Sequence, residues 1–142
     1  MSSFTSPLVV SPLLDGRKWK LVRPFSYHIG SEYSGDIIWV PAGFVTDFAS
    51  VPRVLWTFLP SWGRYGKGAV LHDYLYQFLY WMLEQPQYES LFDHFSYARK
   101  NPRKFADDIF YEAMLVGGTK PWKAWIMYRG VRLLGWLAWR KK

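Results

Sequence analysis

The residues with the clearest capacity for chemistry lie in one short segment, residues 69–76, which reads AVLHDYLY. His72 and Asp73 stand side by side there, among apolar residues typical of a buried helix. A carboxylate taken out of water is strongly destabilised unless a metal, a cation or hydrogen-bond donors meet it, so Asp73 needs a partner. An imidazole is the side chain best suited to moving protons near neutral pH. The segment therefore indicates a site.

A second carboxylate completes this site if two predicted helices pack antiparallel. Residues 106–110 place Asp107 in the middle of a later helix, where such packing brings it to the imidazole of His72. Tyr76 shares the helical face of His72, and Asp73 lies about 100° round the helix. The set suits hydrolysis: Asp107 orients His72, His72 activates a water, and Asp73 binds a divalent metal such as Ca2+.

The same residues fit a purely structural role equally well. In this interpretation His72 and Asp107 satisfy each other between two helices, and Tyr76 adds a third hydrogen bond without any turnover. Spacing alone does not separate a catalytic pair from a structural one, so both interpretations stay open.

Further polar and glycine-rich positions precede this segment. Asp47 is either a metal ligand or, as we favour, a cap that accepts N–H groups at a helix start. Arg53 either binds an anionic group or pairs with Asp47. Gly63, Gly66 and Gly68 resemble a loop that lends carbonyls or amides to an ion, or one that only lets the chain turn tightly.

The first third of the chain predicts a small antiparallel β-sheet, a meander over about residues 8–48. Short runs of β-branched and aromatic residues alternate there with Pro and Gly, at 19–22, 25–29, 37–40 and 44–45. Ser50 is a suitable N-cap for a short helix that follows the sheet. A Gly-rich connector is expected over 60–68.

The remainder, about residues 50–142, is expected to be mainly helical. Apolar spacing predicts a central buried helix over 69–83, followed by a loop or a short helical turn up to residue 99. Asn101 and Pro102 begin the next helix, which Gly117 and Gly118 end. A basic, Trp-rich amphipathic helix follows over 122–140. The fold class is a single α+β domain over 1–142, with a small N-terminal sheet packed with a mainly helical C-terminal half.

The composition limits the class of protein. The chain has 142 residues, enough for one hydrophobic core, and no cysteine, which excludes disulfides and thiolate metal sites. Aromatic residues make up 20% of it, more than a minimal core requires, so some are expected to face a partner. Lys and Arg outnumber Asp and Glu by 18 to 11. This excess favours an anionic partner or simply solubilises the surface.

Neither an export signal nor a membrane-spanning segment is expected. Residues 1–10 lack a basic start followed by an apolar core. No apolar run in the sequence approaches the ~20 residues that a spanning helix needs.

Four sequence words, in this order along the chain, resemble a small uncharacterised family encoded by tailed phages and prophages. They are VPAGFVTDFASVP (40–52), HDYLY (72–76), ADDIF (106–110) and YRGVRLLG (128–135). The resemblance covers about residues 36–135 and brings no established function with it. It implies a viral gene product, found in the virion or the host cytoplasm, that belongs to the particle or is expressed beside its structural genes.

The word HDYLY is also similar to the HDxCY helix of secreted and bacterial phospholipases A2. This resemblance implies that His72 is the catalytic base, Asp73 the calcium ligand and Asp107 the acid that orients the histidine. Tyr76 then belongs to the supporting hydrogen-bond network. The chain departs from these enzymes because it lacks the cysteines that flank the helix, and because its Gly-rich segment from Gly63 lies much closer to the histidine.

Two functions follow as hypotheses. The first is a phage-encoded hydrolase of ester bonds at the cell envelope; the second is a non-catalytic tail, virion or assembly protein whose partners are other phage structural proteins. The helix over 122–140 suits a phospholipid surface, a protein groove or, as we favour, closure of the core. Nucleic acid is a weaker option as partner, because positive charge is scattered along the chain rather than gathered in one stripe.

Overall fold

The computed structural model describes residues 3–4, 8, 10–13, 18–30, 36–46 and 62–139. Over these residues the protein is α+β: short strands occupy the part before residue 47, and helices fill almost all of 62–139. The fold class predicted from the sequence is therefore confirmed. The short helix expected after Ser50 lies outside the described residues.

The described strands form two antiparallel sheets of three strands each. One has the order β1-β4-β5 and the other β2-β3-β6. The bounds are Ser3–Phe4 for β1, Val10–Pro12 for β2, Trp19–Leu21 for β3, Phe25–His28 for β4, Ile37–Val40 for β5 and Val45–Thr46 for β6.

This division differs from the single meander expected over residues 8–48. The chain bends between β3 and β4 at 22–24, where Pro24 has no N–H to offer a ladder, so these consecutive strands do not pair. Instead β6 returns to β3, with Trp19 opposite Thr46, and β4 pairs with β1 and β5.

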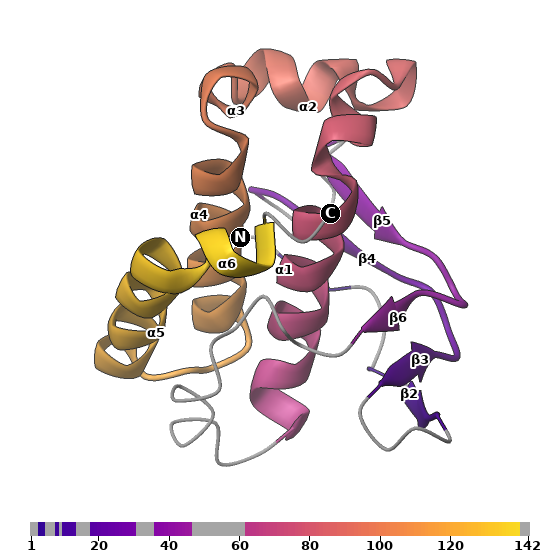
Figure 1. Ribbon diagram of the computed structural model, residues 1–142, viewed down its shortest axis with the longest axis vertical. Helices are drawn as coiled ribbons and strands as arrows, with labels where there is room; N and C mark the ends of the chain where they lie inside the picture. Colours follow the sequence, from indigo (N-terminus) through magenta and orange to yellow (C-terminus); the bar gives the residue numbers. More distant parts are fainter. Residues whose placement is uncertain are drawn as a thin grey trace.

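The helices pack on the far side of α1 from the strands. Figure 1 shows α1 in the middle of the molecule, with the strands on its right and α4 and α5 on its left. The short helices α2 and α3 lie at one end of the molecule. Of the loop or short helical turn expected up to residue 99, the structure has the helical form, in several short helices. The bounds are Trp62–Leu83 for α1, Pro86–Tyr88 for η2, Glu89–His94 for α2, Tyr97–Lys100 for α3, Pro102–Val116 for α4, Pro121–Leu134 for α5 and Trp136–Trp139 for α6.

Helix α1 begins earlier than the sequence predicts. The connector expected over 60–68 is wrong for residues 62–68, which are helical. A Cβ added to Gly68 would stand 3.7 Å from atoms of Phe110 and Ala113, so this turn of α1 packs directly on α4. Such packing outweighs the low helix propensity of glycine. Residues 68–76 are all buried, which confirms the central buried helix.

The C-terminal helix predicted over 122–140 is interrupted. Helix α5 ends at Leu134, and α6 begins after Gly135. A Cβ at Gly135 would overlap the Tyr76 hydroxyl and the Val131 carbonyl oxygen, so only glycine lets these groups approach so closely. The sequence pattern misses this break because the apolar and basic periodicity continues across it.

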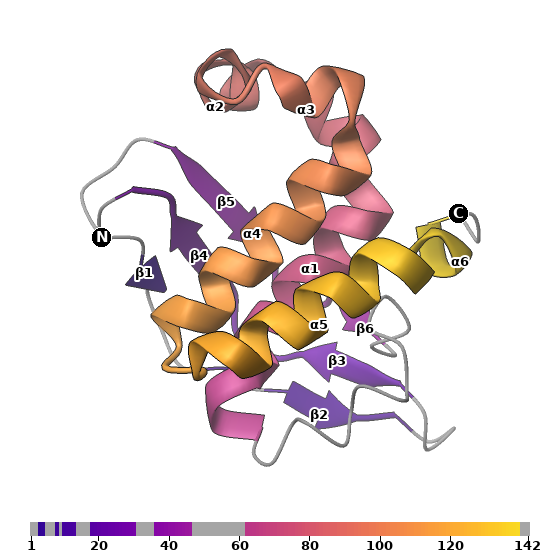
Figure 2. The same cartoon turned by 90° about the vertical axis from the view of Figure 1, so that its left-hand side faces the viewer.

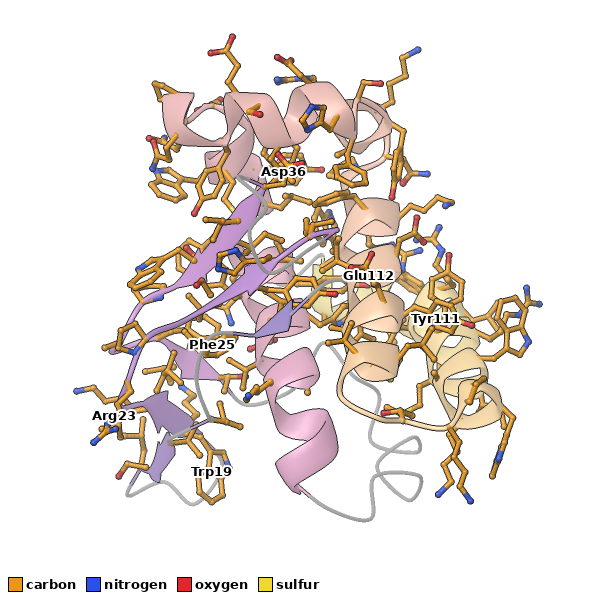
Figure 3. The ribbon with its side chains drawn as sticks, turned by 180° about the vertical axis from the view of Figure 1, so that it is seen from behind. Trp19, Arg23, Phe25, Asp36, Tyr111 and Glu112 are labelled. Atoms are coloured by element: carbon orange, nitrogen blue, oxygen red, sulfur yellow. The ribbon has the colours of Figure 1, made fainter. Side chains whose placement is uncertain are left out.

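The strands and the helices share one hydrophobic core. Phe25 and Tyr27 of β4 are fully buried against the helical half, and the Tyr27 hydroxyl donates to Glu112 Oε1 of α4 at 2.7 Å. Figure 3 labels Phe25 on the strand side and Glu112 on α4. Within the described residues, no helix combines the length and apolarity needed to cross a membrane.

Helix α4 ends in a Schellman motif, which generates a stability prediction. The Thr119 N–H donates to Met114 O at 2.9 Å and the Gly118 N–H to Leu115 O at 3.1 Å, with Gly118 at φ +94°. Because a side chain is strained at that φ, Gly118→Ala is expected to lower the free energy of unfolding by about 1 kcal/mol. Gly117, at φ −75°, is the matched control and is expected to accept Ala without such a loss. Urea denaturation of both variants tests this, and equal losses would contradict it.

Candidate functional site

The candidate site forms where α1 crosses α4. His72 Nε2 lies 2.7 Å from Asp107 Oδ1, and both side chains are 0% exposed. Tyr76, one turn after His72, meets Arg103, one turn before Asp107, so the two helices run antiparallel. The structure thus brings together the histidine and the distant acid that the sequence analysis paired.

The carboxylate of Asp107 is surrounded by donors from three helices. Oδ1 accepts from His72 and from the Tyr76 hydroxyl, the latter at 2.6 Å. Oδ2 accepts from Arg132 of α5 at 2.9 Å and, at a longer 3.4 Å, from Arg103 of its own helix. Since a carboxylate offers about four lone-pair sites, this one is saturated. The charge of Asp107 is therefore fully compensated inside the protein.

Arg103 extends the network to the end of α5. Its guanidinium donates to Val131 O at 2.9 Å and to Arg132 O at 3.0 Å, two carbonyls in the last turn of that helix. Val131 O also accepts from the Gly135 N–H at 2.8 Å. A cation beside these carbonyls opposes the negative end of the helix dipole. Arg103 consequently fixes the position of α5 relative to α4.

The imidazole of His72 is held tightly by its neighbours. Its centroid lies 4.2 Å from the Tyr76 ring and 4.6 Å from the Phe110 ring. Facing a carboxylate oxygen, Nε2 is the donor of this hydrogen bond. Burial, followed by the charge of Asp107, raises the pKa of Tyr76, which keeps its hydroxyl protonated as a donor.

Asp73 faces a different part of the molecule. Its Oδ2 accepts from the Thr46 hydroxyl of β6 at 2.5 Å and from Gln77 Nε2 at 3.0 Å, so it ties α1 to the second sheet. Among the described residues, no three His, Cys, Asp or Glu side chains are grouped to hold a metal ion. Asp47, expected to be a helix cap or a metal ligand, and Arg53, expected to bind an anionic group or pair with Asp47, lie outside the described residues.

Asp108 forms a second cluster beside the first, nearer the surface. It accepts from the Tyr97 hydroxyl at 2.7 Å, from Lys104 Nζ at 2.9 Å and from the Tyr128 hydroxyl at 2.6 Å. Burial raises the pKa of Asp108, but these donors outweigh it, with Lys104 foremost, and hold the pKa below its usual value. Burial and the adjacent carboxylate raise the pKa of Tyr128 to about 12.

Sequence reasoning missed the cations of the site. Arg103 stands four residues before Asp107, a helical spacing that signals an ion pair. Arg132 carries no such local signal, because its partner is 25 residues away on another helix. Both Tyr128 and Arg132 do belong to the word YRGVRLLG, which the sequence analysis noted without assigning a role to its polar residues.

The saturated carboxylate generates a stability prediction. Asp107→Asn removes the negative charge that neutralises Arg103 and Arg132 in a buried place, so it is expected to lower the free energy of unfolding by about 3 kcal/mol or more. Asp108→Asn, at the next position and partly exposed, is the matched control, expected to lose about 1 kcal/mol or less. Chemical denaturation at neutral pH compares them; similar small losses for both would contradict a central role for Asp107.

Asp108 also generates a prediction about acid. Because its pKa is lowered on folding, the unfolded chain binds the proton first as pH falls. The stabilisation is complete above the usual carboxyl pKa of about 4 and is lost as pH falls through the lower folded value. Stability of Asp108→Asn is therefore expected to decline less steeply than that of the wild type below about pH 4. Unfolding curves at a series of acid pH values measure this, and parallel declines would rule it out.

Comparison with known proteins places the chain in a family. No curated protein and no solved structure matches it. The model of one protein family matches residues 19–131, a range that holds four of the six described strands and His72, Tyr76, Arg103 and Asp107, and that ends just before Arg132. The range exceeds half of the chain. Membership of an uncharacterised family, which the sequence words led us to expect, is therefore confirmed. The chain belongs to the family described as "Protein of unknown function (DUF1353)".

Proposed function

We propose that the chain is a non-catalytic structural or assembly component of a tailed-phage particle, with other phage structural proteins as its partners. The phage origin rests on the four sequence words that resemble a phage and prophage family. The observation that carries the non-catalytic role is the complete burial of His72 and Asp107, with two guanidinium groups on the same carboxylate.

Burial argues against proton transfer to a substrate. A general base must come within about 3 Å of the proton that it removes, directly or through one water. The side chain of His72 has no exposed surface, and its ring packs against those of Tyr76 and Phe110. In this conformation the imidazole supports packing between α1 and α4 instead of facing solvent.

The charges around Asp107 point the same way. In a catalytic dyad the acid orients the base and stabilises the imidazolium that forms during the reaction. Here Arg132 and Arg103 already share the negative charge of Asp107. A network compensated in this way holds three helices together, which is the structural interpretation of the pair.

Exposed aromatic side chains outside this network support a role in assembly. Trp39 on β5 and Tyr80 and Trp81 on α1 are large apolar side chains left at the surface. Aromatic residues are enriched in protein interfaces, where they are often the strongest contributors to binding. These residues are candidates for contact with a neighbouring protein of the particle.

The second candidate, a phospholipase A2-like hydrolase at the cell envelope that uses Ca2+, is favoured by one observation. His72 Nε2 and the Tyr76 hydroxyl both contact Asp107 Oδ1, at 2.7 and 2.6 Å. These are the contacts that the HDxCY resemblance implies for a base, its orienting acid and the supporting tyrosine. Catalysis in this form requires a conformation that exposes the ring of His72.

A lipid-release assay separates the two candidates. Fatty acid release from phospholipid vesicles with Ca2+ is measured for the wild type, for His72→Gln and for the exposed His94→Gln as matched control. The non-catalytic role predicts that all three stay at the rate of the protein-free blank. Calcium-dependent release by the wild type and His94→Gln that is lost in a folded His72→Gln would overturn it.

The particle role has its own measurement. A tagged chain expressed from its prophage is expected to sediment with purified particles or with assembly intermediates after induction. His72→Gln, which keeps polar side-chain atoms beside Asp107, is expected to be incorporated as well, because no turnover is needed. A tagged wild-type chain that stays entirely in the unassembled fraction would contradict the proposal.

A further inference from the structure

The net positive charge of this protein comes from one segment. Residues 113–142 contain seven Lys and Arg residues and no Asp or Glu, whereas residues 1–112 contain eleven of each sign. The whole net charge of +7 therefore belongs to the last 30 residues, which include α5 and α6.

Helix α5 divides that segment into an inner and an outer face. Ala124, Met127 and Val131 are buried against the rest of the protein. At 100° per residue, the opposite side presents five residues, which we call the outer face: Trp122, Trp125, Ile126, Arg129 and Leu133. All are exposed, with Trp122 at 55%, Trp125 at 51% and Leu133 at 65%. In Figure 2 α5 lies at the front of the molecule.

Cations and indoles are paired along this helix. Lys123 Nζ lies 5.5 Å from the Trp122 ring centroid, and the Arg129 guanidinium lies 5.7 Å from that of Trp125. The ring of Trp125 packs edge-on against that of Tyr111 of α4, with 6.3 Å between the ring centroids; Tyr111 is labelled in Figure 3. The indoles are thus held at the surface beside positive charge, while Arg132 turns inward to Asp107.

We propose that the outer face of α5 docks on an anionic phospholipid surface, with the helix lying along the surface. Trp and aliphatic side chains enter the boundary between headgroups and acyl chains, and Lys or Arg beside them contact phosphates. Within the described part of the chain no helix is suited to cross a membrane, which agrees with a peripheral position. This proposal goes beyond the assembly role and holds for either candidate function.

The residues favour a lipid surface over other anionic partners. Nucleic acid uses cations and aromatic rings, but it has no apolar layer for Ile126 and Leu133 to enter. An acidic protein partner would need a groove deep enough for the outer face and negative charges placed opposite Lys123 and Arg129. A bilayer with anionic headgroups meets both the apolar and the charged requirement without a specific shape.

Vesicle sedimentation tests the proposal with the full chain. Binding to vesicles of phosphatidylcholine mixed with phosphatidylglycerol is compared with binding to pure phosphatidylcholine vesicles, at low and high salt. We expect binding that needs the anionic lipid and weakens with salt. Each cation near such a surface contributes about 1 kcal/mol, or about fivefold in partitioning, so Lys123→Glu with Arg129→Glu is expected to weaken binding at least tenfold, as a rough lower bound.

Matched controls identify the face that binds. Trp122→Ser with Trp125→Ser is expected to reduce vesicle binding about tenfold as well. Trp39→Ser and Lys20→Glu, at equally exposed positions among the strands, are expected to leave it unchanged, and circular dichroism confirms that each variant is folded. Absence of vesicle binding by the wild type would overturn the proposal. Equal losses of vesicle binding in the control variants would overturn it too. So would a wild-type chain that binds DNA and not vesicles, if the α5 variants abolish that DNA binding.

Discussion

The Asp107 carboxylate is the group on which the helical half depends. It is fully buried, so its charge is tolerated only because His72 and Tyr76 of α1, Arg103 of α4 and Arg132 of α5 all donate to it. Each donor comes from a fixed point on its helix. If one of the three helices slid or rotated by one residue, Asp107 would lose at least one of these donors while it stayed buried. The network therefore determines the register of the three helices as well as the fact that they pack together.

The break between α5 and α6 belongs to the same arrangement. Arg103 occupies the carbonyls of Val131 and Arg132, and the missing Cβ of Gly135 leaves room for the Tyr76 hydroxyl. After the break the chain turns back, and Trp139 packs edge-on against Tyr76, at 5.0 Å between ring centroids. The polar network is thereby covered by an aromatic side chain from α6. Any other residue at position 135 would place its Cβ where the Tyr76 hydroxyl lies.

Local sequence patterns predicted the features of the fold that depend on local interactions. The helix over 69–83, the start of α4 at Pro102 and its end at Gly117 and Gly118 follow from apolar spacing and from the conformations of proline and glycine. The contact between His72 and Asp107 could be predicted too, because two antiparallel helices that pack together can bring polar residues on their facing sides into contact. Contacts between distant segments were not. The role of Arg132, the packing that makes residues 62–68 helical and the return of β6 to β3 all depend on tertiary contacts that leave no periodic signal.

Helix α5 shows how one sequence serves the core and the surface together. Its basic residues look alike in the sequence, yet Arg132 compensates Asp107 inside the protein while Lys123 and Arg129 lie beside exposed indoles. The inner residues belong to the hydrophobic core, whereas the exposed tryptophans lie outside it. Exposing the apolar side chains of this face to water is unfavourable compared with burying them against a partner. Its pairing with cations, at the end of the chain that carries all the net charge, is best explained by a surface that is both apolar and negative.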